Sequence, residues 1–546
     1  ACRWPSGWKW EASDQLSTRY SRDDAAWLER WLAERSQPAK PTDIAFLQYT
    51  SGSTRHPKCV MVAPLNLLAN MRSIESTKLH DAETAVAPRE HMACCSWLPQ
   101  YHDMGLIGGC LTSAFLGWRS DLMSPFTFLQ KPFAWLLAIS NLGAEGKMVI
   151  NTAPNFGYAL CLRRAAKPEQ LRQLNLDNWR VAMNGSEPIR ASTLADFNAT
   201  FGPVGFSPGA WACVFGLAEN CLFVCGRAER VPTLMVDRGQ LGVGDAPMPQ
   251  RAPLGDHVLE ACGHYIVPYD VCGNRVAIVH NETRHILPDG TVGEIWLSGD
   301  SVAAGYWDLP ELSEETFRAR ALKGPVAAYN NMAWLRTGDL GFLWESRLYI
   351  VGRIKDVLTM KGRTLHAHDI EVCAEAGASL LRPGCCAAFP ITAEGGEDIL
   401  CLIAEVRPEA EALVADKLDE LARAVVSAIV EGEGVRPHAV VLIKPRATLK
   451  TTSGKLRRRE LRTAYAQLVG GEEPDDVLEM LIPRTAVVHV WEDDGSQPQT
   501  TFAPKSEMPP SLEEAGTSAA HAVAAATTAT ALMAGAALVS LAQAQE

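Results

Sequence analysis

The sequence has no excess of positive charge. Its 546 residues carry 51 Lys and Arg against 63 Asp and Glu, which gives a formal net charge of -12 at pH 7. Proteins that bind nucleic acid or an anionic membrane usually have the opposite balance, so we expect no nucleic-acid partner. Hydrophobic residues make up 47% and charged residues 21%, and this balance is typical of a folded chain rather than a disordered one.

The sequence also lacks a paired cysteine framework and an internal repeat. Its 15 cysteines are an odd number, and they are scattered or adjacent, as in Cys94-Cys95 and Cys385-Cys386. Neither pattern is typical of a disulfide scaffold or a zinc site. Unpaired thiols are typical of a reducing compartment, so we expect an intracellular, cytoplasmic location.

The chain is too long for one hydrophobic core, and its length predicts two or three domains. From Asp43 onward, short apolar runs alternate with helical patterns, which favours an α/β architecture with a substantially parallel sheet flanked by helices. We expect this large domain to cover residues 1–352. The predicted strands lie in DIAFLQYT (43–50), KMVINT (147–152), NWRVAMNG (178–185) and GEIWLSG (293–299), and a predicted helix lies in PLNLLANMRSI (64–74).

A smaller α+β domain is predicted over residues 353–470. It contains a strand over 398–406, a helix and a strand over 439–443, and the helix has an apolar stripe at helical spacing. Residues 471–546 read as a linker and an Ala/Thr-rich tail. A tail anchor would need about 20 residues, which the tail has, but Ala and Thr are only weakly hydrophobic. We therefore expect a low-complexity tail and no stable membrane insertion.

One loop has the composition of a phosphate-binding turn. It reads YTSGSTRHPKCV over residues 49–60, and its hydroxyls and glycine could form a nest of backbone N–H groups that suits phosphate oxygens. The Walker A pattern is absent, and Ser/Thr/Gly-rich turns are common without any ligand. The loop alone therefore does not identify a nucleotide site.

Seven further motifs follow the loop in a fixed order, and together they make the interpretation specific. They are WLPQYHDMGLIGG (97–109), PNFGYALCLRR (154–164), NGSEP (184–188), FGLAE (215–219), RTGDLG (336–341), GRIKD (352–356) and TSGKLRR (452–458). This ordered set resembles the adenylate-forming (acyl-activating, AMP-binding) superfamily over about residues 43–470. Within it, the sequence looks most like the fatty-acyl-AMP ligases.

The resemblance implies that a fatty acid reacts with ATP to give an acyl adenylate and pyrophosphate, with Mg²⁺ as a cofactor. Lys455 matches the lysine expected to contact the acyl carboxylate and the α-phosphate, and His102 matches the residue lining the point where acyl and adenylate meet. Glu219 matches the glutamate that helps to hold Mg²⁺. The remaining nucleotide-binding candidates are Thr50, Ser51, Gly52, Ser53, Thr54 and Lys58 of the loop, Asn184, Gly185, Ser186 and Glu187 at the adenine edge, Phe215 and Gly216 beside the adenine, and Asp339 and Arg353 at the ribose.

The resemblance also implies a conformational switch and an acyl acceptor. Lys355 matches the hinge about which the small, mobile domain of relatives rotates between the two half-reactions. Residues 230–276 lie where fatty-acyl-AMP ligases carry an insertion, and VDRGQL (236–241) resembles part of it. This implies transfer to the phosphopantetheine of an acyl carrier protein rather than to coenzyme A.

Some features depart from the family pattern. Cys59 stands where glycine is usual, and His366 stands where an aromatic residue is usual. Relatives have a longer stretch before the loop, so we expect the large domain to lack part of its N-terminal region. An acyl-CoA ligase and a nucleotide-binding pseudoenzyme or assembly subunit are the alternatives to an active fatty-acyl-AMP ligase.

Overall fold

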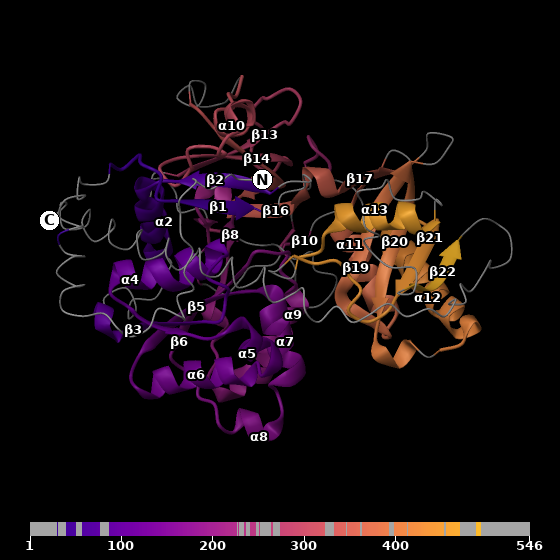
Figure 1. Ribbon diagram of the computed structural model, residues 1–546, viewed down its shortest axis with the longest axis horizontal. Helices are drawn as coiled ribbons and strands as arrows, with labels where there is room; N and C mark the ends of the chain where they lie inside the picture. Colours follow the sequence, from indigo (N-terminus) through magenta and orange to yellow (C-terminus); the bar gives the residue numbers. More distant parts are fainter. Residues whose placement is uncertain are drawn as a thin grey trace.

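The computed structural model contains several separate sheets with helices packed around them (Figure 1). All structural statements below concern the residues that it describes. These are residues 30, 40–50, 57–76, 87–226, 228, 234–235, 241–246, 250–251, 264–265, 274–322, 332–345, 347–360, 363–392, 398–411, 413–451, 455–469 and 487–492.

A five-stranded parallel sheet has the strand order β4-β3-β5-β6-β7. Its central strands are almost continuously buried, because helices cover both faces. Helices α6, α7 and α9 pack on one side around an aromatic cluster that includes Trp135, Tyr158 and Trp179. The elements are β3 (Met92–Ser96), β4 (Arg119–Leu122), β5 (Met148–Pro154), β6 (Trp179–Gly185), β7 (Trp211–Cys213), α6 (Phe133–Ala144), α7 (Asn155–Arg164) and α9 (Ala191–Phe201).

A second five-stranded sheet is antiparallel and has the order β12-β16-β15-β14-β13. Near it lies a hairpin of β1 and β2, which is followed by α2. Buried residues of the hairpin, of α2 and of this sheet form one hydrophobic cluster. The elements are β1 (Phe46–Thr50), β2 (Lys58–Val62), α2 (Pro64–Ser76), β12 (His264–Tyr265), β13 (Arg275–Val279), β14 (Gly293–Ser298), β15 (Leu335–Trp344) and β16 (Arg347–Arg353).

The C-terminal sheet has four strands in the order β19-β20-β21-β22. Its strands β20 and β21 are parallel, because α12 crosses over between them. In Figure 1 this sheet and its helices lie to the right of the other two sheets. The elements are η9 (Ile354–Asp356), β17 (Val357–Met360), β18 (Arg363–His366), α11 (Ala367–Gly377), β19 (Leu381–Thr392), β20 (Asp398–Val406), α12 (Ala415–Glu433), β21 (Ala439–Ile443), α13 (Arg458–Val469) and β22 (Val487–Glu492).

Short elements connect these layers. They are η2 (Arg89–His91), the π-helix η3 (Met104–Leu111), α4 (Thr112–Leu116), α5 (Pro125–Gln130), α8 (Pro168–Leu171), η4 (Gly202–Val204), η5 (Pro208–Ala210), β8 (Phe215–Gly216), η6 (Ala218–Asn220), β9 (Phe223–Cys225), β10 (Leu234–Met235), β11 (Gln250–Arg251), α10 (Pro310–Phe317) and η10 (Pro408–Ala410).

The predicted α/β fold is confirmed, and each predicted strand and helix named above is present. Two details differ. The strand predicted in residues 293–299 lies in the antiparallel sheet, as β14. Residues 487–492 fall in the range predicted as a linker, but they form β22, whose backbone pairs with the exposed edge of β21. The boundary at residues 352 and 353 stays a prediction, and the Ala/Thr-rich tail lies outside the described residues.

Within the described ranges, every helix is too short or too polar to cross a membrane.

Candidate active site

Lys455 lies at a point where charged groups from several parts of the chain converge. It lies between β21 and α13 in sequence, and its backbone N–H donates to Thr451 Oγ1 at 3.1 Å. Burial lowers the pKa of Lys455 and Arg353 lowers it further, whereas Asp103, Glu187 and Asp339 oppose this change. The structure therefore brings the TSGKLRR lysine into one electrostatic environment with carboxylates of three other motifs.

The phosphate-loop prediction can be examined only at its two ends. Thr50 ends β1, and its hydroxyl oxygen is buried without a hydrogen-bond partner in the described part of the chain. Lys58 begins β2, and its Nζ lies 4.8 Å from the centre of the Tyr306 ring. A buried hydroxyl without a partner and a nearby cation both suit a phosphate ligand. Ser51, Gly52, Ser53 and Thr54 lie outside the described residues.

The adenine-edge candidates lie at the carboxyl end of β6, where ligands of parallel sheets usually bind. Asn184 is fully buried, and one of its side-chain atoms, Oδ1, has no partner among the described residues. Gly185 packs against Val214, where an added Cβ would come within 2.5 Å of the Val214 carbonyl oxygen. Ser186 has a φ of +70°, so the backbone turns sharply after the strand.

Glu187 is fixed by the first turn of α7. One of its carboxylate oxygens, Oε1, accepts a hydrogen bond from the Phe156 backbone N–H at 2.5 Å. Burial raises the pKa of Glu187, although this hydrogen bond and the charge of Lys455 oppose the change. The carboxylate therefore caps a helix and faces the Lys455 side of the site.

Glu219 lies in η6, next to the predicted adenine-side residues Phe215 and Gly216 of β8. Its Oε1 accepts a hydrogen bond from the Tyr306 hydroxyl at 2.8 Å. No three His, Cys, Asp or Glu side chains come together as a metal-binding group within the described ranges. A lone carboxylate fits Mg²⁺, because this ion takes one or two protein carboxylates and completes its shell with phosphate and water oxygens.

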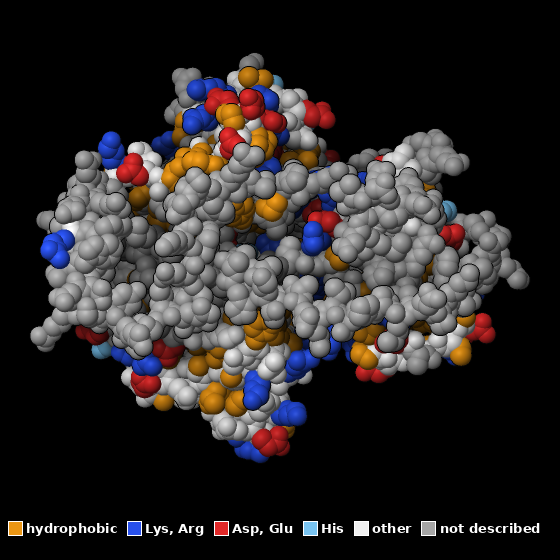
Figure 2. Space-filling view, in the orientation of Figure 1, with side chains coloured by type: hydrophobic (Ala, Val, Ile, Leu, Met, Phe, Trp, Pro, Cys, Tyr) orange, Lys and Arg blue, Asp and Glu red, His pale blue; other side chains and the backbone are white. Residues whose placement is uncertain are grey.

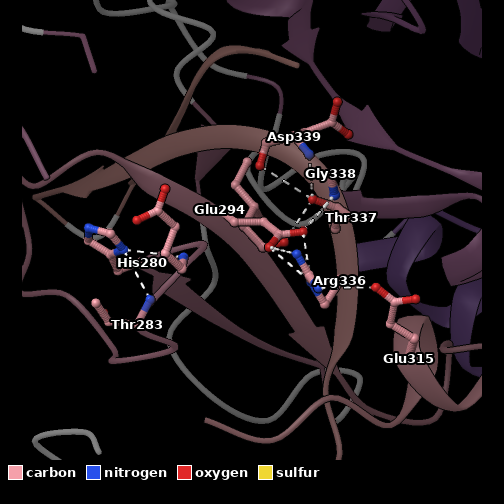
Figure 3. Close-up of polar contacts among 10 residues, drawn as sticks. His280, Thr283, Glu294, Glu315, Arg336, Thr337, Gly338 and Asp339 are labelled. Carbon is pink, nitrogen blue, oxygen red and sulfur yellow. Dashed lines mark hydrogen bonds and ion pairs between the residues drawn. The ribbon is translucent and has the colours of Figure 1, made fainter. Parts of the chain in front are cut away.

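Asp339 is held in place by the antiparallel sheet (Figure 3). Its N–H donates to Thr337 Oγ1 at 3.0 Å, and the Thr337 hydroxyl in turn donates to the Ile295 carbonyl at 2.7 Å. Gly338 between them has a φ of +72°, which favours glycine. Burial raises the pKa of Asp339, although Arg353 on the neighbouring strand opposes the change.

Arg353 lies directly across from Asp339, and its Nε donates to Asp339 Oδ1 at 3.0 Å. The two predicted ribose-side residues are thus neighbours in space. Beneath them Arg336 forms an ion pair with Glu294, which is almost fully buried and also accepts from the Gly338 N–H at 3.2 Å. The pair fixes the turn that presents Asp339 (Figure 3).

His102 has a carboxylate partner in the next residue. Its Nδ1 lies 2.6 Å from Asp103 Oδ1, and that oxygen also accepts from the Met104 N–H at 2.7 Å. Burial alone would raise the pKa of Asp103, but His102 and the charge of Lys455 hold it below its ordinary value. Asp103 therefore carries a negative charge that interacts with both His102 and Lys455.

Lys355 lies in the η9 turn, between β16 of the antiparallel sheet and β17. Burial lowers the pKa of Lys355, and the neighbouring Arg353 adds to this effect. A turn that joins two sheets is a suitable place for a hinge, and the hinge role stays a prediction.

Sequence reasoning missed two residues of this site. Tyr306 contacts both Lys58 and Glu219, and Glu294 supports Asp339 through Arg336. Neither Tyr306 nor Glu294 belongs to one of the motifs above, and Tyr306 lies 87 residues from Glu219 along the chain. Arg336 belongs to RTGDLG and could have been noticed there.

Comparison with known families identifies the family of this chain. The family model described as AMP-binding enzyme matches residues 7–307, more than half of the chain. The chain therefore belongs to the AMP-binding enzyme family, as its motifs predicted.

Three similar proteins show the range of this relationship. A medium-chain-fatty-acid–[acyl-carrier-protein] ligase, TtuA of Teredinibacter turnerae, is 37% identical over 79% of this chain and 64% of its own length. A Mycobacterium tuberculosis protein that bears the name of a fatty-acid–CoA ligase, fadD25, is 36% identical over 78% of this chain and 70% of its own. A fatty acyl-adenylate ligase of Legionella pneumophila, solved with acyl adenylate and pyrophosphate, is 33% identical, covers 83% of this chain and 72% of its own, and has a TM-score of 0.51.

This chain thus spans less than two thirds of the length of the Teredinibacter relative. The names of these relatives confirm the resemblance to fatty-acyl-AMP ligases and include both kinds of acyl acceptor.

Proposed function

We propose that this protein activates a fatty acid with ATP to give an acyl adenylate and pyrophosphate, and then transfers the acyl group to the phosphopantetheine thiol of an acyl carrier protein. The observation that carries the proposal is the position of Lys455. It lies with Asp103, Glu187, Asp339 and Arg353, which come from four separate motifs.

The first half-reaction needs fixed positive charge. A carboxylate oxygen of the fatty acid attacks the α-phosphorus of ATP, a new P–O bond forms, and the bond to the β-phosphate breaks as pyrophosphate leaves. Both reactants are anionic, so the site must offset their repulsion and stabilise the charge that accumulates on the α-phosphate. Lys455 supplies this charge at the α-phosphate, and Lys58 with the Thr50 hydroxyl supports the departing phosphates.

The remaining residues orient the nucleotide. The Asp339 carboxylate accepts hydrogen bonds from the two ribose hydroxyls, while the Arg353 Nε, 3.0 Å from Asp339 Oδ1, keeps the carboxylate in position. Glu187 and Asn184 lie at the adenine edge, and Phe215 packs on the adenine. Glu219 would hold Mg²⁺, which offsets the negative charge of the phosphates when it is bound.

In the second half-reaction, the sulfur of the phosphopantetheine arm attacks the acyl carbonyl, AMP leaves, and the thiol proton is released. Rotation of the C-terminal sheet and its helices about Lys355 would withdraw Lys455 and admit the thiol. The name of the Teredinibacter relative supports a carrier-protein acceptor. The segment predicted as the characteristic insertion, residues 230–276, falls mostly outside the described residues.

Exchange of labelled pyrophosphate into ATP tests the first half-reaction directly. Exchange that depends on both a fatty acid and Mg²⁺ is the expected result. Absence of exchange with fatty acids of all chain lengths would favour the nucleotide-binding pseudoenzyme instead.

The acceptor needs a separate assay. Supplying either coenzyme A or a phosphopantetheinylated carrier protein to the preformed acyl adenylate and identifying the thioester decides between the two acceptors. We expect acylated carrier protein, and an acyl-CoA product alone would make the protein an acyl-CoA ligase.

A further inference from the structure

Two of the carboxylates of helix α11, Glu371 and Glu375, lie one turn apart on the same face. Glu371 is almost fully buried, and both of its oxygens accept from Arg458, each at 2.7 Å. The Glu375 Oε2 lies 3.1 Å from an Arg190 side-chain nitrogen, NH2. The helix thus contacts Arg458 of the C-terminal part through Glu371. Through Glu375 it contacts Arg190, which lies 185 residues before Glu375 in the chain.

The arginine bound by Glu371 belongs to the Lys455 segment. Arg458 follows Lys455 by three residues and begins α13. A third side-chain nitrogen of Arg458, NH1, lies 3.4 Å from the Asp356 carboxylate in η9, next to the predicted hinge residue Lys355. Since a bidentate arginine–carboxylate pair fixes orientation as well as distance, α11 and the Lys455 segment are held together.

The arginine bound by Glu375 belongs to the adenine-edge segment. Arg190 follows Glu187 by three residues, and its backbone N–H donates to Asn155 Oδ1 at 3.3 Å. The same Asn155 oxygen accepts from the Asn184 side chain at 3.3 Å. Arg190 is therefore attached to the same buried amide as the predicted adenine-edge residue Asn184.

The ion pair between Arg190 and Glu375 is more constrained than a typical surface pair. The Glu375 side chain is only 7% exposed, and its second oxygen, Oε1, accepts from the Gly384 N–H at 2.6 Å. Freely exposed pairs contribute little to stability, because both side chains must be ordered when the pair forms. Here the Gly384 amide already holds the Glu375 carboxylate, and the Asn155 side chain already holds the Arg190 backbone.

The surroundings also make Glu375 a specific partner. Arg190 is one of four arginines whose charge acts on Arg163 at the end of α7; the others are Arg164, Arg382 and Arg407. Figure 2 shows Lys and Arg side chains gathered on the visible face between α7 and the C-terminal sheet. In this region Arg382 already pairs with Glu405, and Glu375 of α11 is the carboxylate that pairs with Arg190.

We propose that Arg190 and Glu375 are positioning residues for the adenylation half-reaction, and that their ion pair holds α11 against the adenine-edge segment and so places Lys455 at the α-phosphate. This inference rests on the proposed function. The pair joins the two parts in the arrangement that presents Lys455, and the proposed rotation about Lys355 would break it before the acyl group is transferred.

Half-reaction kinetics of R190Q, E375Q and the charge-swapped R190E/E375R variant test this role. We expect pyrophosphate exchange to fall by about tenfold to a hundredfold in kcat for each single variant, because misplacement of a catalytic group by about 1 Å can cost a hundredfold. Transfer from a supplied acyl adenylate should stay at the wild-type rate. The swap should recover only part of the exchange, because the Gly384 N–H loses its acceptor. R119Q, which loses exposed pairs with Asp121 and Glu145 elsewhere, should behave like the wild type.

A second measurement needs no turnover. Trace labelling of amines with acetic anhydride, read by mass spectrometry, compares the reactivity of Lys455 with that of the exposed Lys131. Lys455 should become several-fold more reactive in R190E, and its reactivity should fall back toward the wild-type value in R190E/E375R. Equal labelling of Lys455 in all variants would overturn the proposal, as would equal loss of both half-reactions. A wild-type chain without exchange would refute the proposed function, and the labelling would still decide the role of the ion pair.

Discussion

Lys455 is the residue on which the proposed chemistry depends most. Lys455→Ala should abolish fatty-acid-dependent pyrophosphate exchange, a loss of at least about 3 kcal/mol of transition-state stabilisation on the scale of preorganised electrostatics. Binding of ATP, measured by calorimetry, should change much less, because the other nucleotide contacts remain. Lys131→Ala, at an exposed position, is the matched control. A near-normal exchange rate in the Lys455 variant would show that another group stabilises the α-phosphate.

Tyr306 was not predicted from the sequence, and its role can be tested separately. Its hydroxyl donates to Glu219 at 2.8 Å, and a hydrogen bond to a charged group contributes about 1.5–3 kcal/mol. Tyr306→Phe should therefore raise the Mg²⁺ concentration needed for half-maximal exchange several-fold, with kcat at saturating Mg²⁺ little changed.

Tyr158→Phe is the control for loss of a buried tyrosine hydroxyl, since Tyr158 donates to the Met183 carbonyl at 2.8 Å, away from Glu219. It should reduce stability and leave the Mg²⁺ dependence unchanged. If both variants had the same Mg²⁺ dependence, Tyr306 would be a structural residue only.

Among the secondary-structure elements, α11 should make stability depend on pH. Burial lowers the pKa of His368 in its first turn to about 3, and the charges of Arg190, Arg458 and His366 add to the effect. In the folded protein His368 therefore stays neutral at pH values below 6.5, where the same side chain in the unfolded chain binds a proton at its ordinary pKa of 6.5. The stability contributed by neutral His368 is fully present above that pH and is lost as the pH falls toward 3.

His368→Gln should flatten this dependence. Between pH 6.5 and about pH 5, the wild type should lose about 2 kcal/mol more stability than the variant, which is the effect of a proton bound only by the unfolded state. Thermal unfolding at several pH values measures the difference. His91→Gln, at an exposed histidine, should follow the wild type. Parallel curves for all three proteins would mean that His368 takes up its proton in the folded state.

Elements were predictable where their pattern is local. Leu418, Leu421, Val425 and Ile429 have helical spacing in the sequence and are all buried on α12, because a helix periodicity requires only neighbours along the chain. The pairing of strands was not predictable in the same way. Both β6 and β14 read as buried strands, yet one lies in a parallel sheet and the other in an antiparallel sheet.

For the whole molecule, the two half-reactions should separate at the hinge. Lys355 lies in a short 3-10 turn, and φ in such turns is usually about -50° to -70°, a range that includes the value of about -65° that proline imposes. Lys355→Pro should keep the present arrangement and block rotation. We expect pyrophosphate exchange to persist and transfer to the acceptor to fall at least about tenfold, as single-turnover assays of each half-reaction would measure.

Lys355→Ala separates loss of the side chain from loss of rotation, and it should retain transfer. Equal transfer by the proline variant and the wild type would place the hinge elsewhere.

The sequence by itself determined the family and the α/β class of this protein, because its motifs and hydrophobic periodicities are local patterns. It also identified Lys455, Asp339, Glu187 and Glu219 as site candidates. Only the tertiary structure decided which charged groups meet: that Asp103 and Glu187 face Lys455, that Tyr306 holds Glu219, and that Arg190 reaches Glu375. The physical reason is that 51 basic and 63 acidic side chains could pair in many ways, and packing of the sheets and helices selects the few pairs that come within hydrogen-bonding distance.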